Sequence, residues 1–181
     1  MKTRKLLFTM IAAMTMMFGL TLTANAEETA PATKVVGVEG IGTFTVPADW
    51  TEEYIEGYGT YWFNPTKTAC ASISYSDCSN TGLADIEVFA PIYKKNLEEY
   101  GCTFIDWKVT KYFNHDAIYS VDIYPGNNNF STDYSVLNLG GLECGYDYYL
   151  GNSGVSVYVG AITAEEFQNV LPMLATYKPV Q

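Results

Sequence analysis

The stretch "TFIDWKVTKYFNHDAIYSVDIYP" (Thr103–Pro125) decides the fold, because apolar and polar residues alternate along both of its halves. Alternate positions share one face of a β-strand, so each half predicts a strand. The apolar positions are Ile105, Trp107 and Val109 in the first half and Tyr119, Val121 and Ile123 in the second. Between the halves, "NHD" (Asn114–Asp116) holds residue types that tolerate the left-handed backbone of a tight turn. The stretch therefore predicts a β-hairpin with its corner at "NHD".

His115 is the only histidine in the chain, and its neighbour Asp116 suggests the hypothesis of a catalytic pair. Adjacent side chains, however, point to opposite faces of a strand and splay toward water in a turn. The sequence also lacks the G-x-S-x-G motif that would place a serine nucleophile. We therefore interpret the pair as part of the turn and assign no catalytic residue.

Further strands are expected on the C-terminal side of the hairpin, followed by a helix. The strand patterns are "TDYSVLNL" (132–139), "CGYDYYLG" (144–151) and "VSVYVGAI" (155–162). Joins rich in Gly and Asn separate them, as is typical of an antiparallel meander. The helix begins after Thr163, whose hydroxyl caps it while Glu166 reaches back, the pattern of a capping box. Its apolar stripe comprises Phe167, Val170, Leu171 and Leu174.

On the N-terminal side, the apolar period changes from two to three or four residues over 84–100, which predicts an amphipathic helix. Gly101 follows it, where a left-handed C-cap belongs, and Pro91 predicts a disturbance inside it. Strand patterns precede this helix at 41–50, 57–65 and 68–76. This order of elements predicts an α+β domain, a mainly antiparallel β-sheet with helices packed on it.

The first 26 residues have the pattern of a secretory signal peptide. Three basic residues precede an apolar run, and "ANA" (Ala24–Ala26) supplies the small residues of a cleavage site. Residues 27–37 are polar and predict a flexible lead-in, and 38–181 predict a single α+β domain. We expect a secreted or extracytoplasmic protein, in a bacterial cell envelope or outside it, with no stable membrane insertion after cleavage.

Cleavage would leave an acidic chain without arginine. Three of the 10 Lys and Arg residues lie in the signal segment, so seven lysines face 20 acidic residues and the net charge is −13. Nucleic-acid binding depends on Lys and Arg, and the Arg fork is the usual partner of phosphate. The composition therefore argues against nucleic acid and against anionic ligands. Neutral sugars, peptides, cations and basic protein surfaces remain as partners.

The cysteines of the mature chain are Cys70, Cys78, Cys102 and Cys144. Outside the cytoplasm they permit two disulfides, with three connectivities, or they remain as buried free thiols. The sequence does not choose among these alternatives. Their spacing lacks the close pairs of zinc knuckles, and the acidic ladder of a calcium loop is missing. We assign no metal and no cofactor.

The order of elements resembles that of the PsbP-like superfamily, which includes the DcrB-type exported bacterial proteins. The segments that carry the resemblance are "FTVPADW" (44–50), "LEEYG" (97–101), "NHDAIYSVDIY" (114–124) and "ITAEEFQNVLPML" (162–174). The resemblance covers nearly the whole mature chain and implies an α/β/α sandwich with a non-enzymatic binding or accessory role. No functional residue is carried over, because members of the superfamily bind unrelated partners through unrelated surfaces.

Aromatic residues make up 15% of the chain and gather in "WTEEYIEGYGTYWF" (Trp50–Phe63). Aromatic faces on a hairpin stack on sugar rings or receive apolar side chains of a partner, although in strands they also pack inward. The candidate binding residues are Trp50, Tyr54, Tyr58, Tyr61 and Trp62. The first hypothesis is an exported, non-enzymatic binding or accessory domain that contacts a protein or glycan.

A secreted hydrolase acting on carbohydrate is the alternative, because Glu52, Glu53 and Glu56 lie in the same segment. Glycoside hydrolysis uses two carboxylates about 5–10 Å apart, one of them with a raised pKa. A concave pocket with two converging carboxylates would favour the enzyme, whereas an exposed aromatic patch would favour the binding domain.

Overall fold

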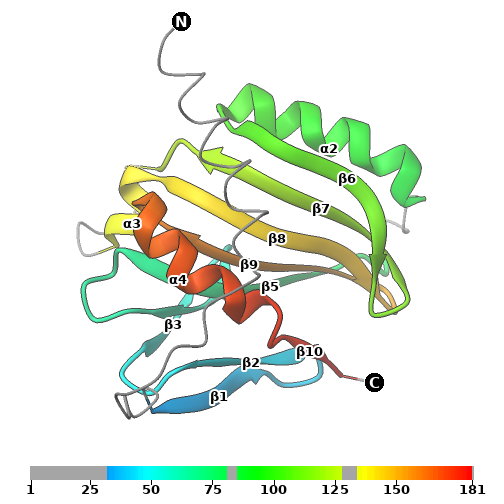
Figure 1. The fold of residues 1–181 in the computed structure, drawn as a ribbon. Coiled ribbons are helices and arrows are strands. Elements are labelled where there is room, and N and C mark those ends of the chain that lie inside the picture. Colours follow the sequence, from blue (N-terminus) through cyan, green and yellow to red (C-terminus); the bar gives the residue numbers. More distant parts are fainter. Residues whose placement is uncertain (1–31, 81–84, 128–133, 181) are drawn as a thin grey trace, which may run out of the picture. The chain divides into compact units, whose positions relative to one another are not determined.

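Two antiparallel sheets are present in the computed structural model, which describes residues 32–80, 85–127 and 134–180 of the chain. Within these ranges, the larger sheet has the order β3 (Thr51–Ile55), β4 (Gly59–Phe63), β5 (Ala69–Asp77), β9 (Ser153–Ala161), β8 (Gly141–Leu150), β7 (His115–Tyr124) and β6 (Thr103–Tyr112). The smaller sheet has the order β1 (Thr33–Val38), β2 (Gly42–Pro47) and β10 (Lys178–Pro179). Figure 1 shows both sheets.

Three helices of the described residues flank the larger sheet: α2 (Ile86–Tyr100), α3 (Ser135–Leu139) and α4 (Ala164–Leu174). On one face, α2 packs on β6 and β7, and its Ala90 contacts Ile118. On the opposite face, α4 packs across β5, β8 and β9 and also contacts β2 (Figure 1). These layers confirm the predicted α+β sandwich.

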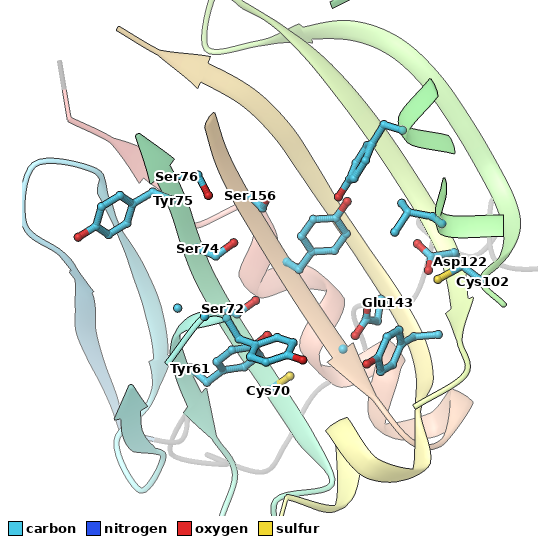
Figure 2. Close-up of a pocket in the computed structure, with 18 of the residues that line it drawn as sticks. Tyr61, Cys70, Ser72, Ser74, Tyr75, Ser76, Cys102, Asp122, Glu143 and Ser156 are labelled. Atoms are coloured by element: carbon cyan, nitrogen blue, oxygen red, sulfur yellow. The ribbon is translucent and has the colours of Figure 1, made fainter. Parts of the chain in front are cut away.

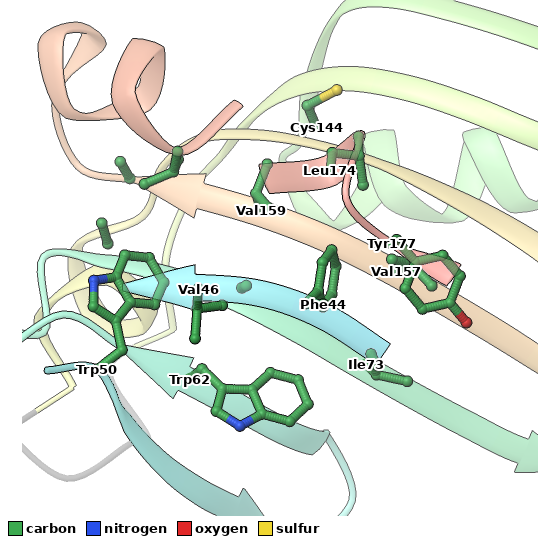
Figure 3. Packing of buried hydrophobic residues seen from close by; sticks show 14 of the residues in the cluster. Phe44, Val46, Trp50, Trp62, Ile73, Cys144, Val157, Val159, Leu174 and Tyr177 are labelled. Atoms are coloured by element: carbon green, nitrogen blue, oxygen red, sulfur yellow. The ribbon is translucent and has the colours of Figure 1, made fainter. Parts of the chain in front are cut away.

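The main core lies between the α4 face of the larger sheet, the helix α4 and strand β2. Phe44 and Trp62 are fully enclosed there, with their ring centroids 6.3 Å apart in an edge-to-face arrangement (Figure 3). Tyr177 is also buried, and its hydroxyl lies 2.7 Å from that of Tyr148. Because side chains alternate along β2, Phe44 and Val46 both point into this core.

Helix α2 ends at the predicted Gly101 cap and begins at Ile86, two positions after the start of the predicted range. The Asp85 side chain accepts a hydrogen bond from the amide of Glu87 at the N-terminus. Gly101 adopts φ 114° at the C-terminus, a left-handed conformation that favours glycine. The helix continues through Pro91, which is exposed. Water can therefore reach the carbonyl group that Pro91 leaves without an amide donor.

Helix α4 begins at the predicted N-cap, Thr163, and Glu166 reaches back to the hydroxyl of that residue. The Thr163 hydroxyl accepts a hydrogen bond from the Glu166 amide at 3.2 Å and donates one to the Glu166 carboxylate at 3.2 Å. The same carboxylate accepts a hydrogen bond from the Thr68 hydroxyl at 2.5 Å, which ties the start of α4 to the segment before β5. Phe167, Val170 and Leu174 are the buried stripe of the helix.

Replacing Thr163 with alanine is expected to lower the free energy of unfolding by about 1 kcal/mol, because the first-turn amide loses its acceptor. Urea denaturation of the two proteins measures the difference. Thr163→Ser keeps the hydroxyl and serves as the control, with a much smaller loss. Equal losses in the two variants would show that the cap does not stabilise α4.

Three sequence predictions need correction. The corner of the hairpin is Phe113–Asn114, both with positive φ, while His115 and Asp116 already belong to β7. The pattern at 132–139 is not a strand: Ser135–Leu139 form α3, because β7 pairs directly with β8 and leaves no place between them. Its first two residues lie outside the described residues. The predicted lead-in is likewise wrong from Thr33 on, where β1 pairs with β2.

The corrected hairpin separates the proposed catalytic pair. Asp116 forms an ion pair with Lys111, with 2.6 Å between Nζ and Oδ1. The His115 ring packs instead near Tyr148, with centroids 5.4 Å apart. Each residue therefore has its own contacts on its own side of the strand, and the geometry does not form a dyad.

Candidate functional site

A pocket of about 490 Å³ lies on the face of the larger sheet that also carries α2. We call it the sheet pocket, and Figure 2 shows the side chains around it. Its lining is Tyr54, Gly57, Tyr58, Gly59, Tyr61, Cys70, Ser72, Ser74, Tyr75, Ser76, Tyr93, Leu97, Cys102, Asp122, Tyr124, Glu143, Ser156, Tyr158 and Gly160. This volume suits a small ligand or one protruding side chain of a larger partner.

Among the described residues, helices cover the two sides of this face and leave the sheet pocket between them. Helix α2 packs on β6 and β7, and α3 packs on Phe63 and Cys70 at the other side. Between them, strands β5 and β9 present small residues to the same face, among them Ser72, Ser156 and Gly160. Short side chains below and helices at the sides leave a hollow over the middle of the sheet.

Asp122 on β7 and Glu143 on β8 are directly paired across the two strands, and both line the sheet pocket (Figure 2). Side chains paired in this way have Cβ atoms about 5 Å apart, so the carboxylates are neighbours. Burial raises the pKa of Glu143 to about 8, and the charge of Asp122 adds to the rise. Burial also raises the pKa of Asp122 to about 6, although a hydrogen bond with Ser120 opposes this. Near neutral pH the pair holds about one proton.

A third carboxylate, that of Asp147 on β8, lies on the same face and accepts hydrogen bonds from the sheet and from Tyr93 on α2. Ser156 Oγ donates to one oxygen at 2.5 Å, and Tyr158 Oη donates to the other at 2.6 Å. The Tyr158 hydroxyl also lies 3.2 Å from the Ser120 hydroxyl. Burial raises the pKa of Asp147 to about 6 in spite of these bonds. The network fixes the Tyr158 ring at the floor of the sheet pocket.

The electrostatic character of the sheet pocket is negative. Its lining residues, all of them described, include two carboxylic acids and no Lys, Arg or His. Burial, with the Glu143 charge as a further cause, raises the pKa of the Cys70 thiol. Burial and the charges of Asp122 and Glu143 raise the pKa of the Cys102 thiol. Both thiols are therefore neutral at physiological pH and unsuited to act as nucleophiles.

The structure divides the candidate binding residues into two groups. Trp50 and Trp62 are only 5% and 0% exposed and belong to the main core, so they are not available to a partner. Their alternation in the hairpin directs them to the α4 face, where apolar burial is greatest. Tyr54, Tyr58 and Tyr61 line the sheet pocket, and their role in binding remains a prediction.

Glu52 and Glu53 have structural partners in the hairpin, and Glu56 is exposed in the turn between β3 and β4. Glu52 accepts a hydrogen bond from Trp62 Nε1 at 2.8 Å. Glu53 lies 2.6 Å from Lys67 Nζ and accepts a hydrogen bond from Tyr134. Hydrogen bonds with Lys67 and Tyr134 lower the pKa of Glu53, which is opposite to what a catalytic acid requires. These carboxylates serve the structure of the hairpin.

Sequence reasoning missed Asp122 and Glu143. Alternation along the second half of the hairpin puts Asp122 on the strand face opposite Tyr119, Val121 and Ile123, and a charged residue inside a strand is the available signal. Glu143 lies one residue outside the predicted strand at 144–151, so it had no assigned face. The pairing of β7 with β8 brings the two carboxylates together.

The cysteines adopt the unbridged alternative. Cys70, Cys102 and Cys144 are buried free thiols, and Cys78 Sγ lies 3.6 Å from the carbonyl oxygen of Ser76. Cys144 faces the main core while Cys102 lines the sheet pocket, so the sheet lies between them. In the part of the chain that the structure describes, no group of three His, Cys, Asp or Glu side chains is placed to hold a metal ion. Over the same residues, no helix has the length and apolar character to cross a membrane.

No protein-family model and no curated protein matches the sequence. The solution structure of cyanobacterial PsbP (CyanoP) from Synechocystis sp. PCC 6803 matches the fold, with a TM-score of 0.58 and 7% identity over 88% of this chain and 99% of that one. The Ran-binding protein Mog1p of Saccharomyces cerevisiae gives a TM-score of 0.49, with 8% identity over 82% of this chain and 96% of that one. The CyanoP match shows that the chain has the PsbP-like fold that its order of elements resembles.

Proposed function

We propose that this chain is an exported, non-enzymatic binding domain that holds a small ligand, or one side chain or sugar unit of a larger partner, in the sheet pocket. The observation that carries the proposal is the hollow itself. Seven tyrosines line it together with four serines, and residues of α2 and of β3, β4, β5, β7, β8 and β9 contribute. Tyrosine offers rigid contact area and a hydroxyl at low entropic cost, which suits recognition.

Two features of the site support binding over catalysis. The Asp122 and Glu143 carboxylates stand side by side on adjacent strands, on one wall of the sheet pocket. Glycoside hydrolysis places its two carboxylates on either side of the scissile bond. The thiols of the pocket are protonated, and the hydroxyls of its serines lack a histidine base, because His115 packs against Tyr148 instead.

A carbohydrate hydrolase remains the second candidate because one observation favours it. Asp122 and Glu143 are two neighbouring acids whose pKa values, about 6 and about 8, differ. Such a pair can hold one acid protonated and one ionised near neutral pH. This candidate predicts turnover of a glycan that is lost in both Asp122→Asn and Glu143→Gln.

Filling the sheet pocket tests the proposed function. The protein would be purified from a host that exports it, and screened by aromatic NMR shifts against sugars, amino acids, amines and short peptides. Ser74→Phe places a ring in the hollow and is expected to lower the affinity for the tightest-binding ligand of the screen by at least about tenfold. Thr51→Phe, at an exposed position outside the lining, is the matched control and should bind normally.

Three results would contradict the proposal. Equal binding by Ser74→Phe and Thr51→Phe would place the site elsewhere. Glycan turnover that depends on Asp122 and Glu143 would establish the hydrolase. Retention of the protein in the cytoplasm of its own organism would remove the exported role.

A further inference from the structure

The described lining of the sheet pocket concentrates negative charge. Asp122 and Glu143 line it, Asp147 lies in the same sheet face, and its described lining contains no cationic side chain. Carboxylates removed from water are costly unless a cation or hydrogen bonds compensate them. An anionic ligand would add a further charge of the same sign. The charge of the site therefore favours a cationic occupant.

Within the described residues, Glu143 in particular has no hydrogen-bond donor to its carboxylate. Ser120 hydrogen-bonds to Asp122, and Ser156 and Tyr158 hydrogen-bond to Asp147. The two oxygens of a carboxylate can accept several hydrogen bonds, and none of those donors comes from a described residue in the case of Glu143. Its oxygens remain open to the hollow, as Figure 2 shows. A primary ammonium group placed there would supply both the charge and the donors, and a quaternary ammonium would supply the charge.

The walls around Glu143 suit an organic cation. The phenols of Tyr61, Tyr93 and Tyr124 lie close enough to Glu143 for its charge to contribute to their raised pKa values. Aromatic faces attract alkylammonium and quaternary ammonium groups, more strongly when water is excluded. A bare metal ion instead needs several converging oxygen, nitrogen or sulfur ligands.

We infer that the sheet pocket binds a small organic cation, a primary or quaternary ammonium, with the Asp122–Glu143 pair as its counterion and the tyrosine rings as its walls. The inference rests on the proposed function, because it names the ligand class of the same pocket. It extends that function from a general binding role to selection by charge.

Cation binding is then coupled to proton release. The titratable groups around Glu143 come from every neighbouring element: Tyr61 on β4, Cys70 on β5, Tyr93 on α2, Cys102 before β6, and Asp122 and Tyr124 on β7. Of these only Asp122 loses its proton below neutral pH. A cation stabilises the ionised form of Glu143, so the affinity of the sheet pocket for the cation rises as the pH rises through about 8.

The test compares charged probes with a neutral probe of the same shape. Choline and cadaverine would be titrated into the exported protein and monitored by tyrosine NMR shifts, beside 3,3-dimethylbutan-1-ol, the uncharged isostere of choline. We expect at least one of the two cations to bind at least about tenfold more tightly than the alcohol near pH 8.5, and about tenfold more weakly near pH 6. Calorimetry in two buffers measures the released proton.

Glu143→Gln keeps the shape of the side chain and should abolish both the preference for the cation and its pH dependence. Glu39→Gln is the control, because Glu39 is exposed in the β1–β2 turn and its loss changes the net charge equally. Circular dichroism verifies that both variants are folded. The pH dependence of the unsubstituted protein tests the inference even if Glu143→Gln fails to fold.

The possible failures are distinguishable. Equal affinity for choline and the alcohol, or binding of a neutral sugar in the absence of cation binding, would overturn the inference and leave the proposed function intact. Tighter binding of Ca²⁺ or Mn²⁺ than of either organic cation would overturn it in favour of a metal site. Absence of binding by every probe and by the wider panel would overturn the inference and the proposed function together.

Discussion

Replacing Trp62 with alanine is expected to lower the free energy of unfolding by about 3–5 kcal/mol, the largest effect of any single substitution proposed for this protein. Trp62 is 0% exposed, and its ring packs edge-to-face on Phe44. Its removal leaves a cavity between β4 and β2 that the surrounding strands can fill only in part. Urea denaturation followed by tyrosine fluorescence measures the loss.

Two matched variants serve as controls for the stability loss of Trp62→Ala. Trp62→Phe keeps an aromatic ring in the core but removes the Nε1 donor to Glu52, so its loss should be smaller, about 1–2 kcal/mol. Tyr54→Ala removes an aromatic side chain from the same hairpin at a position 72% exposed, and should change stability by less than about 0.5 kcal/mol. A loss below about 1 kcal/mol for Trp62→Ala would contradict its place in the core.

Raising the pH from about 5 to about 9 is expected to destabilise the protein, with roughly 3–4 kcal/mol lost through Glu143 alone. The ordinary pKa of 4.5 applies to the unfolded chain, whereas burial raises the pKa in the folded protein to about 8. Between these two pKa values the folded state binds one proton more than the unfolded chain. The contribution of Glu143 to stability is therefore fully present below pH 4.5 and is lost as the pH rises toward 8. Asp122 and Asp147, raised from 3.8 to about 6, act in the same direction at lower pH.

Other shifted groups act outside this window. The pKa of Glu53 is lowered, so its stabilisation is lost only as the pH falls below its usual range. The raised tyrosine pKa values, such as that of Tyr61, affect stability only above about pH 10. Stability between pH 5 and 9 therefore reports mainly on the acids of the sheet pocket and its floor.

Glu143→Gln is expected to remove most of the loss above pH 6, since glutamine carries no charge to desolvate. Denaturation curves at several pH values, compared with those of Glu39→Gln, measure the change. If stability were to rise with pH over this range, or if the two variants gave parallel curves, Glu143 would not have the raised pKa on which this prediction depends. Choline, if it binds as inferred, should reduce the loss in the unsubstituted protein.

Much of the fold could be predicted from local patterns. The alternation in 103–125 identified the hairpin, and the capping box at Thr163 identified the start of α4, because both depend on neighbours within a few residues. The strand prediction for 132–139 was wrong because it, too, used only neighbours within a few residues. Short apolar runs fit a strand or a helix turn equally well, and only the direct pairing of β7 with β8 decides between them.

Only some residues of the sheet pocket could be predicted from the sequence. The aromatic segment was identified, but the direction of each ring was not, so Trp62 in the core and Tyr61 in the sheet pocket were placed together. Adjacent residues of a strand face opposite layers, and only the position of α4 shows which layer is the core.

The sequence by itself determined that this chain is acidic, lacks arginine after its N-terminal segment and builds an α+β sandwich. Only the tertiary structure decided where the charge acts. Asp122 and Glu143 are 21 positions apart in the chain, and the register of β7 with β8 makes them neighbours. Charge interactions depend on distance and burial, which are properties of the folded sheet and are absent from the order of residues.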